Sequence, residues 1–157
     1  MKTVENFLQS KQINYSLHEH PEVYTCEDAD KYCKNIPGLT CKNLFLKDKK
    51  GKRYFLVIIP AKKQAELKKI CETIGVSKVS FANEQTLQEK LDLKPGSVSP
   101  FGLINDKNNE VEVYIDKEVL EADIVGFHPN RNTATLELSG EMFKKFFKAI
   151  NKEIHII

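Results

Sequence analysis

The chain has 157 residues, with 24 Lys+Arg against 22 Asp+Glu and a hydrophobic content of 41%. This length fits one domain covering residues 1–157, and the composition is too apolar for a disordered chain. The longest apolar run, residues 55–60, is far below the about 20 residues of a membrane span, and the amino terminus lacks a signal peptide's apolar stretch. We therefore expect no membrane partner and a cytoplasmic location, where the four cysteines, none in C-x-x-C spacing, stay reduced.

The first half of the chain is predicted to hold short helices followed by a β-hairpin. Apolar residues at helical spacing indicate helices, and runs of β-branched and aromatic residues indicate strands. The expected elements, in chain order, are a helix capped by Thr3 and running to about Gln12, an extended piece over 15–17, a helix beginning at Thr25 with Asp28 as capping-box partner, a loop over 35–40, and a hairpin of 41–46 and 54–59.

The second half alternates helices and strands in the same way. Its expected elements are a helix over 62–74 stopped by Gly75, a strand over 79–81, a helix from Asn83 to about Leu91, strands at 103–104 and 111–115, one helical turn capped by Asp116, strands over 124–127 and 133–138, a helix capped by Ser139, and a last strand over 154–157. Hairpins mixed with helices predict an α+β domain, and no G-x-G-x-x-G follows a strand, so a Rossmann nucleotide site is not expected.

Charge is unevenly distributed along the chain. Residues 42–69 contain ten basic and two acidic residues, a net charge of +8, so the remainder carries −6 of the total of +2. A basic hairpin followed by a lysine-bearing helix is a candidate phosphate-binding surface, and an ordinary solvated face is the alternative. Lysine contacts to phosphate add affinity and salt dependence but no sequence readout.

The first of three informative motifs is KNLFL, residues 42–46. In an alternating strand Lys42 shares a face with Leu44 and Leu46, while Asn43 and Phe45 occupy the other face. A lysine beside two leucines either extends its ammonium to the rim of the apolar surface or points into a pocket.

The second motif is the loop PGSVSPFG, residues 95–102. Its glycines let backbone N–H groups approach a ligand closely, and such groups stabilise a developing oxyanion. A purely structural turn is the alternative. The motif is not a G-x-S-x-G nucleophile elbow, because Pro100 stands where the second glycine belongs.

The third motif, FHPNRNTAT over residues 127–135, places a histidine, two asparagines and two threonines at the end of a strand. Loops held by strands are where sites commonly lie. The alternative is that His128 is a hydrogen-bonded structural residue.

Taken in this order and spacing, KNLFLKD, PGSVSPFGL and FHPNRNTAT resemble the YbaK/ProX family of aminoacyl-tRNA editing domains, and most nearly its freestanding prolyl-tRNA-associated deacylases that clear Ala-tRNA(Pro). The resemblance runs from residue 20 through the last helix. It implies a single α+β domain with a mixed, mostly antiparallel, barrel-like sheet and peripheral helices. It also implies trans-editing hydrolysis of the ester of a mischarged tRNA(Pro), without metal or other cofactor and without a covalent intermediate.

The resemblance further implies where the site lies. Lys42 takes the place of the family's essential lysine near the terminal adenosine, where it is expected to position the substrate and act electrostatically. The oxyanion donors are expected to be backbone groups near Gly102. The expected substrate contacts are His20, Asn43, Ser97, Val98, Ser99, Phe101, Phe127, His128 and Asn132, and the expected tRNA phosphate contacts are Lys47, Lys49, Lys50, Lys52 and Arg53.

The expected partner is the acceptor end of a mischarged tRNA, together with prolyl-tRNA synthetase as a candidate, and DNA is not expected. Three alternatives stay open at this point. The removed amino acid is serine or cysteine rather than alanine, the domain is a non-catalytic tRNA- or synthetase-binding module, or it is a small-molecule or redox protein that uses its cysteines.

Overall fold

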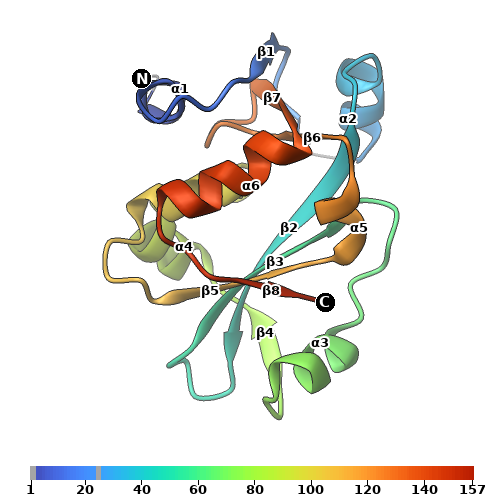
Figure 1. Cartoon of the computed structure of the whole chain (residues 1–157). Helices are drawn as coiled ribbons and strands as arrows, with labels where there is room; N and C mark the ends of the chain where they lie inside the picture. Colours follow the sequence, from blue (N-terminus) through green and yellow to red (C-terminus); the bar gives the residue numbers. More distant parts are fainter. Residues whose placement is uncertain (1–2, 24–25) are drawn as a thin grey trace.

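The longest strand is β2, a run of ten residues that pairs with three other strands, β3, β4 and β6 (Figure 1). The computed structural model describes residues 3–23 and 26–157. Its elements are α1 (Thr3–Ser10), β1 (Ser16–Glu19), α2 (Cys26–Cys33), β2 (Leu39–Asp48), β3 (Tyr54–Pro60), α3 (Leu67–Ile74), β4 (Val79–Phe81), α4 (Glu84–Leu91), the 3-10 helix η1 (Pro100–Asn105), β5 (Val111–Ile115), α5 (Lys117–Glu121), β6 (Ile124–Phe127), β7 (Ala134–Ser139), α6 (Gly140–Ala149) and β8 (Ile154–Ile156).

Eight strands form one sheet in the order β1-β7-β6-β2-β3-β5-β8, with β4 paired to β2 beside that path. Four of the seven strand pairs are antiparallel, and the β2–β6, β3–β5 and β5–β8 pairs are parallel. The α+β class and the mixed sheet with peripheral helices are confirmed. The strand order is an open path that ends at β1 and β8, so the hydrogen bonding of the described strands does not close a barrel.

One edge of β2 is only partly covered. Near its start Leu39 and Thr40 pair with β6, and near its end residues 46–48 pair with β4. Along the other edge β3 pairs with β2 from Cys41 to Lys47. The carbonyl of Phe45 also accepts a hydrogen bond from the N–H of Ala82, just after β4, at 3.0 Å. Residues 41–44 therefore face β3 on one side and have no backbone partner on the other among the described residues, which leaves a free stretch of strand edge that begins with Cys41, Lys42 and Asn43.

The two faces of the sheet carry separate cores. The larger core joins residues of β3, β5, β6 and β7 to side chains of α1, α4, η1 and α6, and its phenylalanines Phe143, Phe146 and Phe147 are almost completely buried. The predicted aromatic stripe of the last helix is thus core. A smaller core lies on the opposite face between β2, β3 and α3, around Leu46, Phe55 and Ile70. Apolar side chains therefore anchor β2 and β3 from both sides.

Helix starts follow the predicted caps closely. The side chains of Asn83, Asp116 and Ser139 each accept a hydrogen bond from a backbone N–H in the first turn of α4, α5 and α6. Gly75 ends α3 with a φ of 86°, in the left-handed region that favours glycine. The predicted capping residue Thr25 lies outside the described residues, and α2 begins immediately after it. None of the described helices is long and apolar enough to cross a membrane.

Three predicted boundaries are wrong. Leu103 and Ile104 lie in η1 rather than a strand, because Ser99 caps that turn and Pro100 occupies its first position, where the fixed φ of proline favours a helical start. The helix predicted over 62–74 begins only at Leu67, since the apolar residues at helical spacing all lie from there onward. The loop predicted over 35–40 is shorter, because β2 already begins at Leu39.

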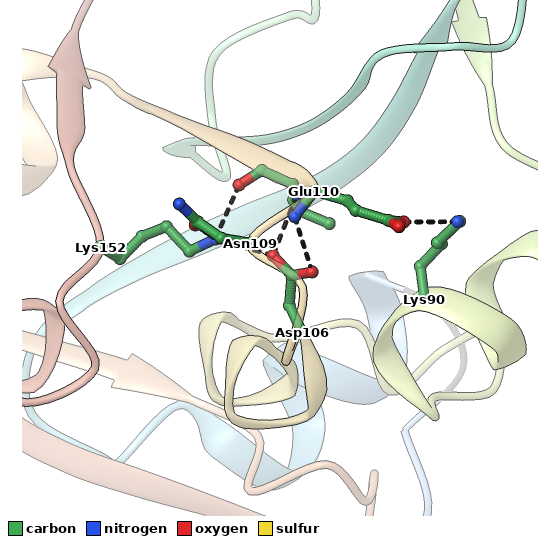
Figure 2. Close-up of polar contacts among 6 residues, drawn as sticks. Lys90, Asp106, Asn109, Glu110 and Lys152 are labelled. Atoms are coloured by element: carbon green, nitrogen blue, oxygen red, sulfur yellow. Dashed lines mark hydrogen bonds and ion pairs between the residues drawn. The ribbon is translucent and has the colours of Figure 1, made fainter.

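A buried ion pair ties the last strand to the turn before β5. The carboxylate of Asp106 accepts hydrogen bonds from the backbone N–H groups of Glu110 and Val111, both at 2.9 Å. The ammonium of Lys152 donates to Asp106 at 2.7 Å and to the side-chain oxygen of Asn109 (Figure 2). The Lys152 and Asp106 side chains are only 6% and 3% exposed. Removing the lysine therefore leaves a buried carboxylate without its counter-charge.

We predict that Lys152→Met lowers the free energy of unfolding by about 3 kcal/mol, the range found when one partner of a buried ion pair is removed. Equilibrium urea unfolding measures the change. Lys117→Met is the matched control, because its pair with Glu121 is exposed and such pairs contribute less than about 1 kcal/mol. Equal stability of the Lys152 variant and the control would contradict the assignment of this ion pair as a structural anchor.

Candidate functional site

The free stretch of β2 lies level with the loop that follows β6. In the parallel pairing Thr40 stands beside Gly126, so Lys42 and His128 are each two residues further along their own chains. Side chains two apart along extended chain point to the same face. Lys42 and His128 therefore leave β2 and β6 on the same face of the sheet, the one opposite the larger core.

Two histidines meet on this face. The rings of His20 and His128 contact edge to face with centroids 5.9 Å apart. Nε2 of His20 is 2.9 Å from Oγ1 of Thr135, and its backbone N–H donates to the carbonyl of Thr133. The pair thus joins the chain after β1 to the loop before β7, two segments more than a hundred residues apart.

The tautomer of His128 follows from its partner. Its Nδ1 lies 2.8 Å from the carbonyl oxygen of Ala134, which can only accept, so Nδ1 carries the proton. Burial lowers the pKa of His128 below its ordinary value, and the nearby His20 lowers this pKa further, against the opposing effect of the Ala134 hydrogen bond. Neutral His128 therefore presents Nε2 as a hydrogen-bond acceptor at neutral pH.

Lys42 is half-buried on its strand. Its Nζ donates a 2.7 Å hydrogen bond to the carbonyl oxygen of Lys63, in the loop before α3. An ammonium has three N–H donors, so two remain for other acceptors. The described contacts of Lys42 therefore lead to the α3 side of this face, and no hydrogen bond among the described residues joins its ammonium to either histidine.

Asn43, next along the free stretch, carries an unsatisfied polar atom. Its strand partner Ile58 belongs to the larger core, so Asn43 points to the face opposite Lys42. Its Oδ1 is shielded from solvent and has no hydrogen-bond partner within the described part of the chain. A buried acceptor left unpaired is costly, and such atoms in native proteins point to a missing partner. A group with an N–H or O–H donor would satisfy it.

The predicted 96–102 loop is tied to the loop after β6. The hydroxyl of Ser99, fully buried, donates to Oδ1 of Asn130 at 2.8 Å and accepts from the N–H of Phe101 at 3.1 Å. The N–H of Gly102 donates to the carbonyl of Ser99 at 3.2 Å. A Cβ at Gly102 would lie 2.6 Å from Cδ1 of Leu93, so a larger residue there would displace the Leu93 side chain.

These bonds change the expected donors in the loop. The N–H groups of Phe101 and Gly102 are already used, whereas those of Val98 and Ser99 make no hydrogen bond within the described residues. Val98 is half-buried against the larger core, and Ser97 is 8% exposed. The donors of this loop that remain available therefore precede Pro100 rather than follow it.

Two expected substrate contacts have their rings in the core. Phe101 is 0% exposed and packs edge to face against Phe146, with centroids 5.1 Å apart. Phe127 is 3% exposed and stacks on Phe143 at 4.9 Å. Both rings support the site from beneath rather than presenting a surface to a ligand.

Hydrogen bonds from distant segments hold the 128–133 loop. Nδ2 of Asn132 donates to the carbonyl of Val23 at 3.3 Å, and the N–H of Val23 donates back to the Asn132 carbonyl at 3.2 Å. The guanidinium of Arg131 makes two hydrogen bonds to the buried carboxylate of Glu5, at 3.2 and 3.1 Å. Asn132 thus acts here as a tether.

Sequence reasoning missed Glu5, Asn130, Arg131 and Thr135 as members of this network. The last three stand inside the motif FHPNRNTAT, so the motif itself was the available signal. Nothing comparable distinguishes Glu5, which lies on the first helix and becomes notable only through its burial and its arginine partner.

The structure divides the expected phosphate contacts into two groups. Arg53 donates two hydrogen bonds to the carboxylate of Glu112, at 2.9 and 2.8 Å, so its charge is largely compensated within the fold. By contrast, the remaining four form no ion pair within the described residues: Lys47, Lys49, Lys50 and Lys52. Asp48, the acid among them, accepts the N–H groups of Lys52 and Arg53 and so shapes the turn.

Neither Cys33 nor Cys41 offers an activated thiol. Burial, reinforced by the charges of Asp116 and Glu118, raises the pKa of Cys41 to about 12. Burial also raises the pKa of Cys33, against a hydrogen bond to Thr135. Thiolates are the nucleophilic form, so these two side chains are inert at neutral pH. The described residues contain no cluster of three His, Cys, Asp or Glu side chains suited to a metal ion.

Comparisons with known proteins agree with this arrangement. The aminoacyl-tRNA editing domain family matches residues 20–146. A prolyl-tRNA editing protein, ProX, of Acetoanaerobium sticklandii is 44% identical over 142 residues, covering 90% of this chain and 87% of the relative. The prolyl-tRNA synthetase associated domain-containing protein 1 of Mus musculus is 37% identical over 150 residues, covering 93% and 88%. A crystal structure titled as "a putative trans-editing enzyme for prolyl tRNA synthetase" superposes with a TM-score of 0.73 at 17% identity, covering 98% and 92%.

We predict that His128 makes stability depend on pH. Its pKa is lowered in the folded state, so between that value and the ordinary 6.5 the unfolded chain binds more protons. The stabilising contribution is therefore full above pH 6.5 and is lost as the pH falls below it. Urea unfolding midpoints at pH 7.5 and 5.5 are expected to differ more for the wild type than for His128→Asn. An identical pH dependence in the two proteins would contradict this.

Proposed function

The chain belongs to the aminoacyl-tRNA editing domain family, and from that premise we propose that it hydrolyses the ester of a mischarged tRNA, most readily Ala-tRNA(Pro). The proposal extends to a single domain over 1–157 that acts in trans, in the cytoplasm. The name of the 44% identical relative, a prolyl-tRNA editing protein, supports the choice of tRNA. The size of the amino acid that is removed rests on the resemblance alone.

The observation that carries the proposal is the unpaired Oδ1 of Asn43 on the free stretch of β2, where Lys42 is the preceding residue. The two side chains leave the strand on opposite faces, so the proposed substrate is seated against the open edge of β2, between them. An aminoacyl-adenosine offers an ammonium and ribose hydroxyls, which are the kinds of donor that this oxygen lacks. The same substrate offers a carbonyl oxygen to the two remaining donors of Lys42. A charge-assisted hydrogen bond from this ammonium is stronger than one from a neutral donor.

Hydrolysis needs water to attack the ester carbonyl carbon, and the ribose oxygen to leave with a proton. We assign to Lys42 the positioning of the substrate and the stabilisation of negative charge on the carbonyl oxygen. The free N–H groups of Val98 and Ser99 supply further donors for that oxyanion. Nε2 of neutral His128 accepts a hydrogen bond from the water or from a ribose hydroxyl.

This assignment needs no nucleophilic side chain, because an aminoacyl ester is already activated and good positioning suffices. Selection of alanine would come from exclusion of the bulkier proline, since a pocket discriminates a single methylene by only about 1–3 kcal/mol but excludes larger groups sterically. Serine and cysteine esters on the same tRNA are the competing substrates. Prolyl-tRNA synthetase is the candidate protein partner, because relatives are named as prolyl-tRNA synthetase associated domain-containing proteins.

We predict that Lys42→Ala lowers kcat/KM for Ala-tRNA(Pro) by at least about 100-fold, the effect of removing one donor that stabilises an oxyanion. The measurement follows loss of the ester bond on a panel of tRNA(Pro) charged with alanine, serine, cysteine or proline. Lys62→Ala is the matched control, an exposed lysine of the same basic segment without an ion pair among the described residues.

Full activity of Lys42→Ala would overturn the assignment of Lys42. No turnover of any substrate by the wild type, with tRNA binding retained, would favour the non-catalytic binding module. Retained activity after replacement of all four cysteines would discard the redox alternative.

We also predict that the hairpin lysines set the salt dependence of tRNA binding. Each phosphate contact contributes about 0.7 to 0.9 to the slope of log K against log salt. The double variant Lys49→Gln/Lys50→Gln is therefore expected to reduce that slope by about 1 to 2, whereas Lys144→Gln, on an exposed position of α6, leaves it unchanged. Binding titrations at several salt concentrations measure the slope, and equal slopes for both variants would exclude this surface.

A further inference from the structure

An aromatic ring lies exposed at the edge of the basic hairpin. Phe81, the last residue of β4, is 57% exposed, although Val79 of the same strand is buried. Among the described residues the other exposed large apolar side chains are Leu17 and Ile156, on β1 and β8 at the two ends of the sheet. Phe81 is therefore the one exposed aromatic ring in the described part of the chain, and it lies on β4, the short strand that pairs with β2 beside the main path of the sheet.

The register of the sheet places this ring on the same face as Lys42. Phe81 pairs directly with Leu46 across the β2–β4 ladder, so their side chains share a face. Leu46 in turn shares that face with Lys42, four residues earlier on β2. At about 3.3 Å per residue, the ring lies roughly 13 Å along the strand from the lysine.

The surroundings of Phe81 are mainly positive. Lys49, Lys50 and Lys52 lie in the hairpin turn beyond Leu46, and Lys78 is exposed immediately before β4, whereas Lys47, paired with Ser80, points to the opposite face. Of the nearby acids, the carboxylate of Asp48 is engaged by two backbone N–H groups of the turn, while Glu84 is exposed at the start of α4. An aromatic ring among lysines is the composition of a surface that binds single-stranded nucleic acid.

We propose that Phe81 is a stacking platform for an unpaired base of the tRNA 3′ end, close to the nucleotide that carries the ester. This inference rests on the proposed function and adds the path of the RNA from Lys42 toward the hairpin along the open edge of β2, because α3 covers Leu44 and Leu46 on the face between Lys42 and Phe81. A distance of about 13 Å corresponds to about four stacked nucleotides at 3.4 Å each, which keeps the ring within reach of the unpaired end. One ring bordered by lysines is too small an apolar surface for a stable protein interface, which favours the RNA.

The test compares two substrates that differ in the nucleotides available to Phe81. Aminoacyl-tRNA carries the whole 3′ end, whereas aminoacyl-adenosine carries the ester and the terminal nucleoside alone. We expect Phe81→Ala to lower kcat/KM for aminoacyl-tRNA by about 5- to 100-fold, the effect of losing one stacked base, and to leave hydrolysis of aminoacyl-adenosine unchanged. Phe81→Trp should retain activity on both, and the exposed Ile156→Ala is the matched control.

The outcomes separate the two proposals. A wild type that hydrolyses neither substrate contradicts the proposed function itself. An active wild type with an unaffected Phe81→Ala, or with equal losses on both substrates, overturns the stacking platform while leaving the function in place. A loss that appears only when prolyl-tRNA synthetase is present would assign the ring to a protein partner and likewise overturn it.

Discussion

The arrangement of this molecule depends on the incomplete pairing of β2. Ten residues of continuous strand need partners for their backbone groups, and β3 satisfies one edge along almost the whole length. The other edge is shared between β6 and β4 with the residue that follows it, which leave the stretch 41–44 between them. That gap brings a lysine to one face and an unsatisfied amide to the other, at a point where two cores fix the backbone. Had β6 or β4 extended along the whole of this gap, the edge of β2 would be closed to a ligand.

The loops beside this gap gain their order from residues far away in sequence. The 128–133 loop is held by Glu5 through Arg131, by Val23 through Asn132, and by Ser99 through Asn130. Each bond joins the loop to a different segment, so a displacement of one segment is resisted by the other two. This is the arrangement expected of a binding site whose geometry must exist before the substrate arrives, because ordering it on binding would cost free energy.

The sequence predicted most elements because their signals are local. Capping side chains such as Ser139 and Asp116, the apolar spacing of α6 and the polar turn of the β2–β3 hairpin all act within a few residues. The three motifs, and the family resemblance that rests on them, correctly located the loops at 95–102 and 127–135 that a hydrogen bond joins in the structure. What failed was conformational or depends on distant partners. In η1, for example, the apolar pair Leu103 and Ile104 was expected to form a strand, whereas the Ser99 cap and Pro100 begin a 3-10 turn.

The chemistry of individual site residues was predicted less well, because it depends on partners that no spacing reveals. Phe101 and Phe127 occupy the motifs of a site, yet their rings complete the core beneath it. Arg53 was counted with the free lysines until Glu112, fifty-nine residues away in sequence, proved to hold its guanidinium. The composition of a motif therefore specifies where a site lies more reliably than which of its atoms are available for a ligand.

The contacts of Lys42 explain how one side chain can serve both the fold and the site. Its bond to the carbonyl of Lys63 fixes the direction of the ammonium, and Lys63 is itself fixed by a 2.9 Å bond from its own ammonium to Asp116. A long flexible side chain loses much conformational entropy when it is ordered. Since one hydrogen bond within the protein already restrains Lys42, a substrate that takes the two remaining donors incurs less of that cost. Lys42 therefore loses less conformational entropy on binding a ligand than an unrestrained surface lysine would.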